Sequence, residues 1–510
     1  MTTEKTLPPL DGGLAAEPAT WRRWAALGVL SMALLTVVMD LTILNVALPI
    51  LSTDLRPSAT QQLWIIDAYS LVLAGLLVSM SALADRWGRR RLLMAGFAVF
   101  GAASFLVLWA NSPAEVIALR VLLGVGGAMI MPTTLSMLRV VFTDNRERTL
   151  ALGVWAAVSA AGAAIGPVIA GLLLEHFSWH SAFLVNVPPM VICLIAAALI
   201  LPESRVADTA PIDILAAALS IVGMASLVWS IKEFGKHFTT DGLANPAAWT
   251  ALVVAVITLT WFVRRCLSRR DPLLDVRLFL RPQLTAGVLT ALFAMLAMGA
   301  GLLLVAQWLQ LVAGHTALEA GIRLLPFAGG ALITSLLAQR AVDAVGARFV
   351  VSGGLWLAAA GFVLFFVAPE PLTYSWVAAA MLLLGAGAGS LAIASAMIMS
   401  GSPQRQAGNA AAIEETAYDI GNVLGVALLG TIAAASFADR VGEAGGADQS
   451  LAAAVEIGES TGDMELITRA TTAFTDALAQ VGLVGAILLA AAGGLVFALT
   501  PRNVDIDVQH

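Results

Sequence analysis

The chain is divided into long apolar runs, joined by short polar connections, that have the length needed to cross a bilayer. The runs are continuous and do not alternate in polarity, which favours membrane-spanning helices over the strands of a transmembrane barrel. With 59% hydrophobic and 12% charged residues, the chain has too few charges to cover a soluble domain. We therefore predict an all-α polytopic membrane protein.

The positions of the apolar runs and of the residues that interrupt them predict fourteen membrane-spanning helices. The expected spans are residues 24–51, 61–83, 92–110, 115–138, 150–174, 181–201, 212–231, 247–265, 283–312, 319–340, 348–368, 373–399, 406–435 and 477–499. If both termini are cytoplasmic, most of the 28 Lys and Arg residues fall in cytoplasmic connections, and few, Lys232 among them, fall outside. We therefore expect a multi-pass protein of the cell (inner or plasma) membrane with cytoplasmic termini.

A weak internal repeat predicts how the spans are organised. The spacing Asp-x-x-Gly-x-Arg occurs at 85–90, after the second span, and again at 343–348, after the tenth. Repeats of this kind indicate two related halves with a substrate site between them near the midplane. We expect six-helix halves at 23–205 and 271–500, two inserted helices within 206–270, and cytoplasmic tails at 1–22 and 501–510. The acidic connection 436–476 is expected outside, as a solvated loop or as a short helical hairpin.

Several carboxylates lie inside the expected spans, where a charged group is costly and is kept for function. Asp40 is in the middle of the first span, and Asp67 is in the second. In the thirteenth, Glu415, Asp419 and Asn422 follow one helix face, with Glu414 and Tyr418 about a quarter-turn away. Because two adjacent buried acids cannot both be ionised cheaply, we expect at least one of Glu414 and Glu415 to hold a proton.

Arg120 and Trp64 indicate what the buried carboxylates could bind. Arg120, in the fourth span, is expected near the depth of Asp40 and Asp67 and needs a carboxylate partner, either as a proton-coupled switch with Asp40 or a neighbour or as a static ion pair. Trp64 shares a helix face with Asp67, and an acid beside an aromatic ring suits an organic cation. The alternatives are a structural role for Asp40 and an interfacial Trp64 with Asp67 solvated at the mouth of the bundle.

Six motifs carry a resemblance to a known family. They are MDLTILNVALP (39–49), ADRWGRR (84–90), RVLLGVGG (120–127), GAAIGPVIAG (162–171), QWLQ (307–310) and NAAAIEETAYD (409–419). The sequence resembles the fourteen-helix drug:proton antiporters of the major facilitator superfamily, most of all the quaternary-ammonium and dye exporters. The resemblance implies the major facilitator fold and export of lipophilic monovalent cations, ethidium among them, by alternating access. Ala331 stands where some relatives carry an acid that is associated with divalent drugs, which argues against dications.

The residue patterns and the resemblance together predict three groups of site residues. Proton coupling is expected at Asp40, Arg120, Glu414, Glu415 and Asp419. Substrate binding is expected at Asp67, Trp64, Tyr69, Gln307, Gln310, Glu415, Tyr418 and Asn422. A cytoplasmic charge lock is expected at Asp85, Arg86, Gly88, Arg89 and Arg90, and a small-residue packing face with a kink at Gly162, Gly166, Pro167 and Gly171.

Other functional classes lack their motifs in this sequence. It contains no phosphate-binding loop of the Gly-x-x-x-x-Gly-Lys type, no metal-ligand cluster and no catalytic nucleophile pattern. We therefore expect no enzymatic activity, no cofactor, no bound metal and no nucleic-acid partner. The expected partners are lipophilic cations, protons and the lipid bilayer, with a monomeric chain. Two alternatives stay open: an exporter of one specific metabolite or self-made antibiotic, and a membrane receptor or scaffold that transports nothing.

Overall fold

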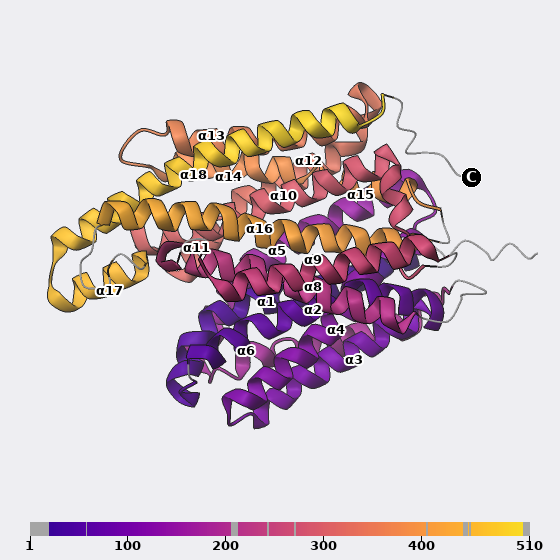
Figure 1. Ribbon diagram of the computed structural model, residues 1–510, viewed down its shortest axis with the longest axis horizontal. Coiled ribbons are helices and arrows are strands. Elements are labelled where there is room, and N and C mark those ends of the chain that lie inside the picture. The colour runs from indigo at the N-terminus through magenta and orange to yellow at the C-terminus, as the bar shows by residue number, and fades with distance from the viewer. Residues whose placement is uncertain are drawn as a thin grey trace, which may run out of the picture.

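The computed structural model describes residues 20–57, 59–205, 213–241, 244–269, 272–403, 406–441, 447 and 450–502. Within these ranges every regular element is a helix, and the long helices run side by side (Figure 1). Most of the predicted tails, residues 1–19 and 503–510, lie outside the described ranges.

The first eight expected spans are helical. Their elements are α1 (Thr20–Leu55), α2 (Ala59–Trp87), α3 (Arg89–Leu106) with the turn η1 (Val107–Trp109), α4 (Pro113–Val141), α5 (Asn145–His176), α6 (Ser181–Leu184) with α7 (Val187–Ile200), α8 (Ile214–Asp241) and α9 (Pro246–Ser268). Ser112 and Glu115 form a capping box that begins α4, and Gly88 takes a φ of 108° where α2 turns into α3.

The remaining expected spans are also helical. Their elements are η2 (Val276–Leu280), α10 (Pro282–Gln307) continued by the π-helical η3 (Trp308–Val312), α11 (Ala317–Arg323) with α12 (Leu325–Val345), α13 (Ala347–Val367), α14 (Tyr374–Ala388) with α15 (Leu391–Ser400), α16 (Ala407–Val441), α17 (Leu451–Thr461) and α18 (Met464–Leu499).

Thirteen helical segments of the described chain are long and apolar enough to span a membrane. The one expected span that is not among these thirteen, residues 150–174, lies in α5, a helix of 32 residues. The predicted fold class, an all-α bundle with fourteen membrane-spanning helices, is therefore confirmed.

The connection after α16 differs from a solvated loop. Ser450 caps α17, Gly462 ends it in a left-handed conformation, and Asp463 caps α18. Helix α17 packs against α18 at Gly458 and Ile467. The described part of this segment therefore forms the helical hairpin that was one of the two predictions, and not a solvated loop. Residues 442–446 and 448–449 lie outside the described ranges.

The two ends of the bundle are defined by these features. We call the end where α2 turns into α3 the motif end, and the end that carries α17 the hairpin end (Figure 1). Along the bundle α1 packs against α5, α2 against α4, α10 against α16, and α13 against α18. The pair α8 and α9 lies on one face, where α8 contacts both α2 and α16. A helix from the middle of the chain thus lies between helices of the two predicted halves.

Candidate functional site

A cavity of about 750 Å³ lies between helices from both predicted halves. Its walls are mostly apolar, and at the hairpin end Leu451 of α17 and Phe474 of α18 line it. The charged and amide side chains that line it are Asp67, Arg120, Lys232, Gln307, Gln310, Glu415, Asp419 and Asn422. Tyr418 also lines it, so six of the eight predicted substrate-binding residues are brought together here. Trp64 and Tyr69 are not among the lining residues.

Asp40 and Arg120 form an ion pair that is removed from solvent. The Arg120 Nη1 atom lies 2.7 Å from the Asp40 Oδ2 atom, and both side chains are only 1% exposed. The Arg120 Nε–H donates to the Ile65 carbonyl at 3.1 Å, and its guanidinium lies 4.5 Å from the Tyr69 ring centroid. Tyr69, predicted to bind substrate, is instead buried beneath Arg120 and donates its hydroxyl to the Val37 carbonyl.

Asn186 completes this cluster, and the sequence analysis missed it. It precedes the first residue of α7, and its side-chain amide donates to the second oxygen of Asp40, Oδ1, at 2.7 Å. Both Asp40 oxygens are therefore hydrogen-bonded, which offsets part of the cost of burying the charge. In the sequence, Asn186 is a single amide residue at the start of an apolar run, and this was the only feature that could have indicated its role.

Asp67 pairs with a lysine that the sequence analysis placed in an outer connection. Because α8 continues beyond the expected span to Asp241, Lys232 lies on this helix and its Nζ atom is 2.8 Å from the Asp67 Oδ1 atom. The same ammonium donates to the Ser70 hydroxyl at 2.9 Å. Trp64 is 40% exposed, packs against Trp229 and is not among the residues that line the cavity, so its expected part in substrate binding beside Asp67 stays a prediction.

The two glutamates of α16 have different surroundings. The Tyr418 hydroxyl donates to the Glu414 Oε1 atom at 2.6 Å, and Glu414 is completely buried. Glu415 lines the cavity, is 1% exposed, and neither of its carboxyl oxygens has a hydrogen-bond partner among the described residues. The structure thus places Glu415 toward the cavity and Glu414 toward Tyr418, a choice that the sequence left open.

Asp419 and Asn422 lie on the same helix face as Glu415, as the spacing predicts. Asn422 faces α10 at Gly299, where a Cβ atom would overlap the Asn422 amide oxygen. Glycine at this position therefore lets α10 approach α16 at the polar part of the cavity.

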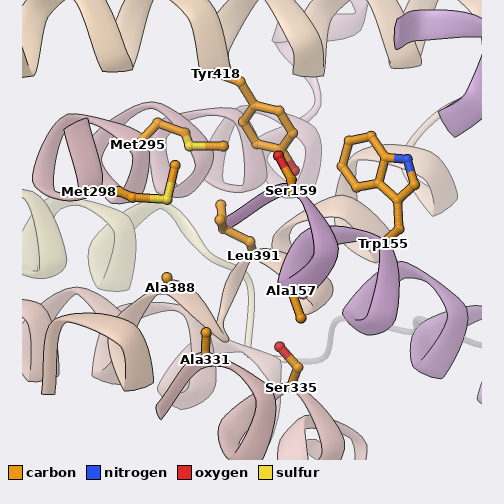
Figure 2. A pocket seen from close by; sticks show the side chains of 10 residues that line it. All are labelled: Trp155, Ala157, Ser159, Met295, Met298, Ala331, Ser335, Ala388, Leu391 and Tyr418. Atoms are coloured by element: carbon orange, nitrogen blue, oxygen red, sulfur yellow. The ribbon is translucent and has the colours of Figure 1, made fainter. Parts of the chain in front are cut away.

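A smaller apolar pocket adjoins the large cavity and holds Ala331 (Figure 2). Tyr418 and Trp155, whose ring centroids are 6.3 Å apart, lie on one side, and Met295 and Met298 also line it. Ala331 and Ser335 of α12 lie across the pocket (Figure 2). An acid at position 331 would therefore lie close to the interface between α5, α10 and α16.

The glycines of α5 pack against the segment of α1 that carries Asp40. A Cβ atom on Gly166 would overlap the Thr42 hydroxyl and come within 2.9 Å of the Met39 carbonyl oxygen. A Cβ atom on Gly162 would lie 3.1 Å from the Leu35 carbonyl oxygen. The predicted close packing at these two positions is present. The helix is continuous through Gly171 and through Pro167, whose side chain lies outside the described part of the structure.

The predicted charge lock lies at the motif end. Arg89 pairs with Asp85 at 2.7 Å and its backbone N–H donates to the Ser204 carbonyl, while Arg90 donates to the Ala198 carbonyl. Glu203 lies against Gly88, where a Cβ atom would overlap its carboxylate. These contacts stay within one predicted half, and Arg86 makes a further interaction of its own.

Other contacts cross between the predicted halves at this end. Ser81 of α2 donates to the Gly408 carbonyl of α16, and Asp85 lies against Gly408 in the first turn of that helix. Arg139 of α4 donates to Ser402 at 3.1 and 3.2 Å. A carboxylate near a helix N-terminus is favourable, so Asp85 also contributes to the contact between the two predicted halves through the first turn of α16.

A bundle of membrane-spanning helices around a mostly apolar cavity that charged and amide side chains also line, with buried acids in both halves, is typical of a polytopic transporter. Residues 30–426 match the family model of the Major Facilitator Superfamily. The chain therefore belongs to this superfamily, and the resemblance to its fourteen-helix drug exporters is confirmed by the relatives that follow.

Three curated relatives are drug efflux or resistance proteins. The chain is 38% identical to the multidrug efflux pump LfrA of Mycolicibacterium smegmatis over 499 residues, covering 96% of this chain and 98% of the relative. It is 38% identical to the methyl viologen resistance protein SmvA of Salmonella typhimurium over 426 residues, covering 82% and 84%. It is 31% identical to the tetracenomycin C resistance and export protein of Streptomyces glaucescens over 462 residues, covering 87% and 81%.

The crystal structure of the human organic anion transporter MFSD10 (TETRAN) has a similar fold. The TM-score is 0.58 at 13% identity, and the match covers 92% of this chain and 99% of that structure. This likeness shows the fold alone. The family match and the curated relatives identify the chain as a multi-pass membrane transporter of the drug-efflux type.

Proposed function

We propose that this chain exports lipophilic monovalent cations, such as quaternary ammonium compounds and ethidium, in exchange for protons. Export takes place across the cell membrane, with the motif end and both termini in the cytoplasm. The binding residues are the acids and amides that line the large cavity, and no cofactor takes part, because the proton gradient supplies the free energy.

One observation supports this proposal: the Glu415 carboxyl faces the cavity, and neither of its oxygens has a hydrogen-bond donor among the residues that the structure describes. An ionised carboxylate without a partner in an apolar cavity is costly, so the empty site favours a protonated Glu415. An organic cation in the cavity supplies the missing positive charge and favours the ionised form. Glu415 therefore holds either a proton or a cation, and this exclusion is the basis of an exchanger.

The cavity suits a large apolar cation. Its volume of about 750 Å³ lies in the range of small-molecule sites, and its walls are mostly apolar. Asp419 adds a second acid on the face of Glu415, and the amides of Gln307, Gln310 and Asn422 supply neutral hydrogen-bonding groups. Burial of apolar surface would then supply most of the affinity, while the acids select for positive charge.

The cycle follows from alternating access. With the motif end closed by contacts of Ser81 and Arg139, the cavity extends toward the hairpin end, which corresponds to the outward-facing state in the proposed orientation. Protons entering from outside neutralise the acids and displace the exported cation. The Asp40–Arg120 pair would respond to the same protons, because protonation of Asp40 releases Arg120 from its ion pair.

The relative named for tetracenomycin C resistance and export keeps a second candidate open, export of a single antibiotic or metabolite. The methyl viologen resistance relative raises the question of dications, against which Ala331 argues. Both alternatives predict a substrate profile different from that of a monovalent-cation exporter.

Transport by the purified protein in liposomes tests the proposal. A pH gradient should drive ethidium transport, collapse of the gradient should stop it, and methyl viologen should be transported much more slowly. The Asp419→Asn variant should lose pH-driven transport, whereas Arg440→Met, on the rim at the hairpin end, should retain it. Ethidium movement that is unaffected by the gradient, or that is absent while a single metabolite is carried, would refute the proposal.

A further inference from the structure

Lys232 is a positive charge on the wall of a cavity that is proposed to bind cations. Its ammonium contacts Asp67 at 2.8 Å and the Ser70 hydroxyl at 2.9 Å. The Lys232 side chain is 22% exposed, whereas the Asp67 side chain is 4% exposed. The carboxylate is thus covered, in part, by an ammonium that remains accessible from the cavity.

The helix that carries Lys232 holds it where the two halves meet. Val228 of α8, one turn before Lys232, packs with Leu71 and Ala74 of α2, and Val423 of α16 packs against this cluster. Nearer the motif end, a Cβ atom on Gly75 would lie 3.2 Å from the Ile221 carbonyl oxygen, so α2 and α8 are in close contact. The backbone of Lys232 is therefore fixed, while its four-carbon side chain can change direction.

We propose that the Lys232 ammonium is an internal competitor of the substrate cation, which occupies Asp67 in the empty cavity and is displaced when an organic cation binds. This inference rests on the proposed function, because it concerns the same cavity. It gives the inserted helix α8 a direct part in substrate selection.

A buried carboxylate without a charged partner costs free energy. Without Lys232, the buried Asp67 carboxylate would lose a charged partner, which is unfavourable in a cavity of low polarity. With Lys232 in place, an entering cation gains the attraction of Asp67 only by displacing an ammonium that already holds it. Asp419 of α16 lines the same cavity, so a displaced ammonium would have a second acid available there.

Two consequences follow for export. Competition by Lys232 weakens the binding of every cation that uses Asp67, so only cations with a large apolar surface bind well. The return of Lys232 to Asp67 also assists release of the cation to the outside. A transporter gains from such a competitor, because release of the cargo is as necessary as its binding.

Ethidium binding to the purified full-length protein in lipid nanodiscs tests the inference. In Lys232→Met the dissociation constant for ethidium should fall about fivefold to tenfold, since one partly buried ion pair no longer has to be broken. Lys232→Arg keeps the charge and should bind as the wild type does. Arg440→Met, which removes a positive charge paired with Asp476 at the same end of the bundle, is the matched control and should leave affinity unchanged.

A double substitution separates competition from simple repulsion. When Asp67 is already replaced by Asn, Lys232→Met should produce no further gain, because there is no carboxylate to compete for. An equal gain in both backgrounds would show repulsion by the lysine and would overturn the inference. Unchanged or weaker binding by Lys232→Met and by the second charge-removing variant, Lys232→Gln, would overturn it as well.

The outcome for the wild type distinguishes this inference from the proposed function. Wild-type protein that binds and transports ethidium, with Lys232→Met binding equally well, would refute the internal competitor alone. Failure of both proteins to bind ethidium would refute the proposed substrate class and the competitor together.

Discussion

The buried charges of α1 and α4 and those of α16 differ in how their hydrogen bonds are satisfied. Asp40 has an ion pair with Arg120 and a hydrogen bond from Asn186, so both of its oxygens are occupied. Glu415 is equally buried, yet neither of its oxygens has a partner among the described residues. The first site is a hydrogen-bonded network within one half, in which Arg120 but not Asp40 lines the cavity, and the second presents its carboxyl group to the cavity.

The two sites therefore have different functions. A closed network resists change, because breaking it leaves a buried charge without a partner. An unsatisfied carboxyl on a cavity wall costs free energy until a proton or a cation reaches it. We infer that the Asp40 network stabilises one conformation and that Glu415 carries the exchanged charge. Substitutions at the two sites should therefore affect stability and transport in different proportions.

The largest effect is expected for Asp40→Asn. It leaves Arg120 buried with one uncharged neighbour in place of its carboxylate, so the free energy of unfolding should fall by about 3 to 5 kcal/mol and transport should be lost. Thermal unfolding in detergent and ethidium transport in liposomes measure the two quantities.

A compensating change sharpens this prediction. Combining Asp40→Asn with Arg120→Gln removes both charges and should restore most of the stability without restoring transport. An Asp40→Asn protein that melts and transports like the wild type would show that the ion pair has neither role.

The second effect is expected for Glu415→Gln, with Glu414→Gln as its matched control. Since Glu415 has no hydrogen-bond partner to lose in the described part of the chain, its substitution should leave the melting temperature unchanged or slightly raised while it stops pH-driven ethidium transport. The Glu414 carboxylate accepts a hydrogen bond from the Tyr418 hydroxyl, so Glu414→Gln should lower the melting temperature. It should also retain more ethidium transport than Glu415→Gln does. A larger loss of transport in Glu414→Gln than in Glu415→Gln, or a larger loss of stability in Glu415→Gln, would contradict the assignment of Glu415 to the cavity.

A third, smaller effect is expected at the packing of α5 on α1. The added methyl group of Gly166→Ala would overlap the Thr42 hydroxyl, so we expect a loss of about 1 to 3 kcal/mol of stability and slower transport. Gly28→Ala in α1 is the control, because no atom lies within 4 Å of the position of its Cβ atom. Similar melting curves for the two variants would show that the close approach of α1 and α5 is not required.

The smallest effect is expected outside the membrane-spanning segments, at Asp213. A hydrogen bond from Arg265 holds the pKa of Asp213 below its ordinary value, so this pair stabilises the protein at neutral pH and is lost as the pH falls through the lowered value. Asp213→Asn should reduce the melting temperature slightly at pH 7 and leave ethidium transport unchanged. The difference from wild type should shrink as the pH falls below about 4.

The sequence was sufficient to predict the fold, because apolar runs of bilayer length and the distribution of Lys and Arg define the spans directly. It also predicted that the buried Arg120 needs a carboxylate near its own depth, with Asp40 and Asp67 as candidates, and the structure shows that the partner is Asp40. Single-helix periodicity placed Glu415, Asp419 and Asn422 on one face, which the structure reproduces along the cavity wall.

The predictions differ from the structure where the position of a side chain depends on contacts between helices that are distant in the sequence. Lys232 was placed in a connection because hydropathy ends the span before α8 ends, and its partner Asp67 lies 165 residues earlier. Trp64 and Tyr69 are close to Asp67 in sequence, but the rotation of α2 directs one toward Trp229 and the other beneath Arg120. Helical spacing predicts which residues share a face, and only packing decides what that face contacts.

Proton release on substrate binding tests the central claim most directly. Ethidium added to weakly buffered, purified wild-type protein should release protons with the same dependence on concentration as binding, and release should be reduced in Glu415→Gln. Binding without proton release in the wild type, or equal release in Glu415→Gln, would contradict the account, because the cavity carboxyl would then not be the group that the proton and the cation share.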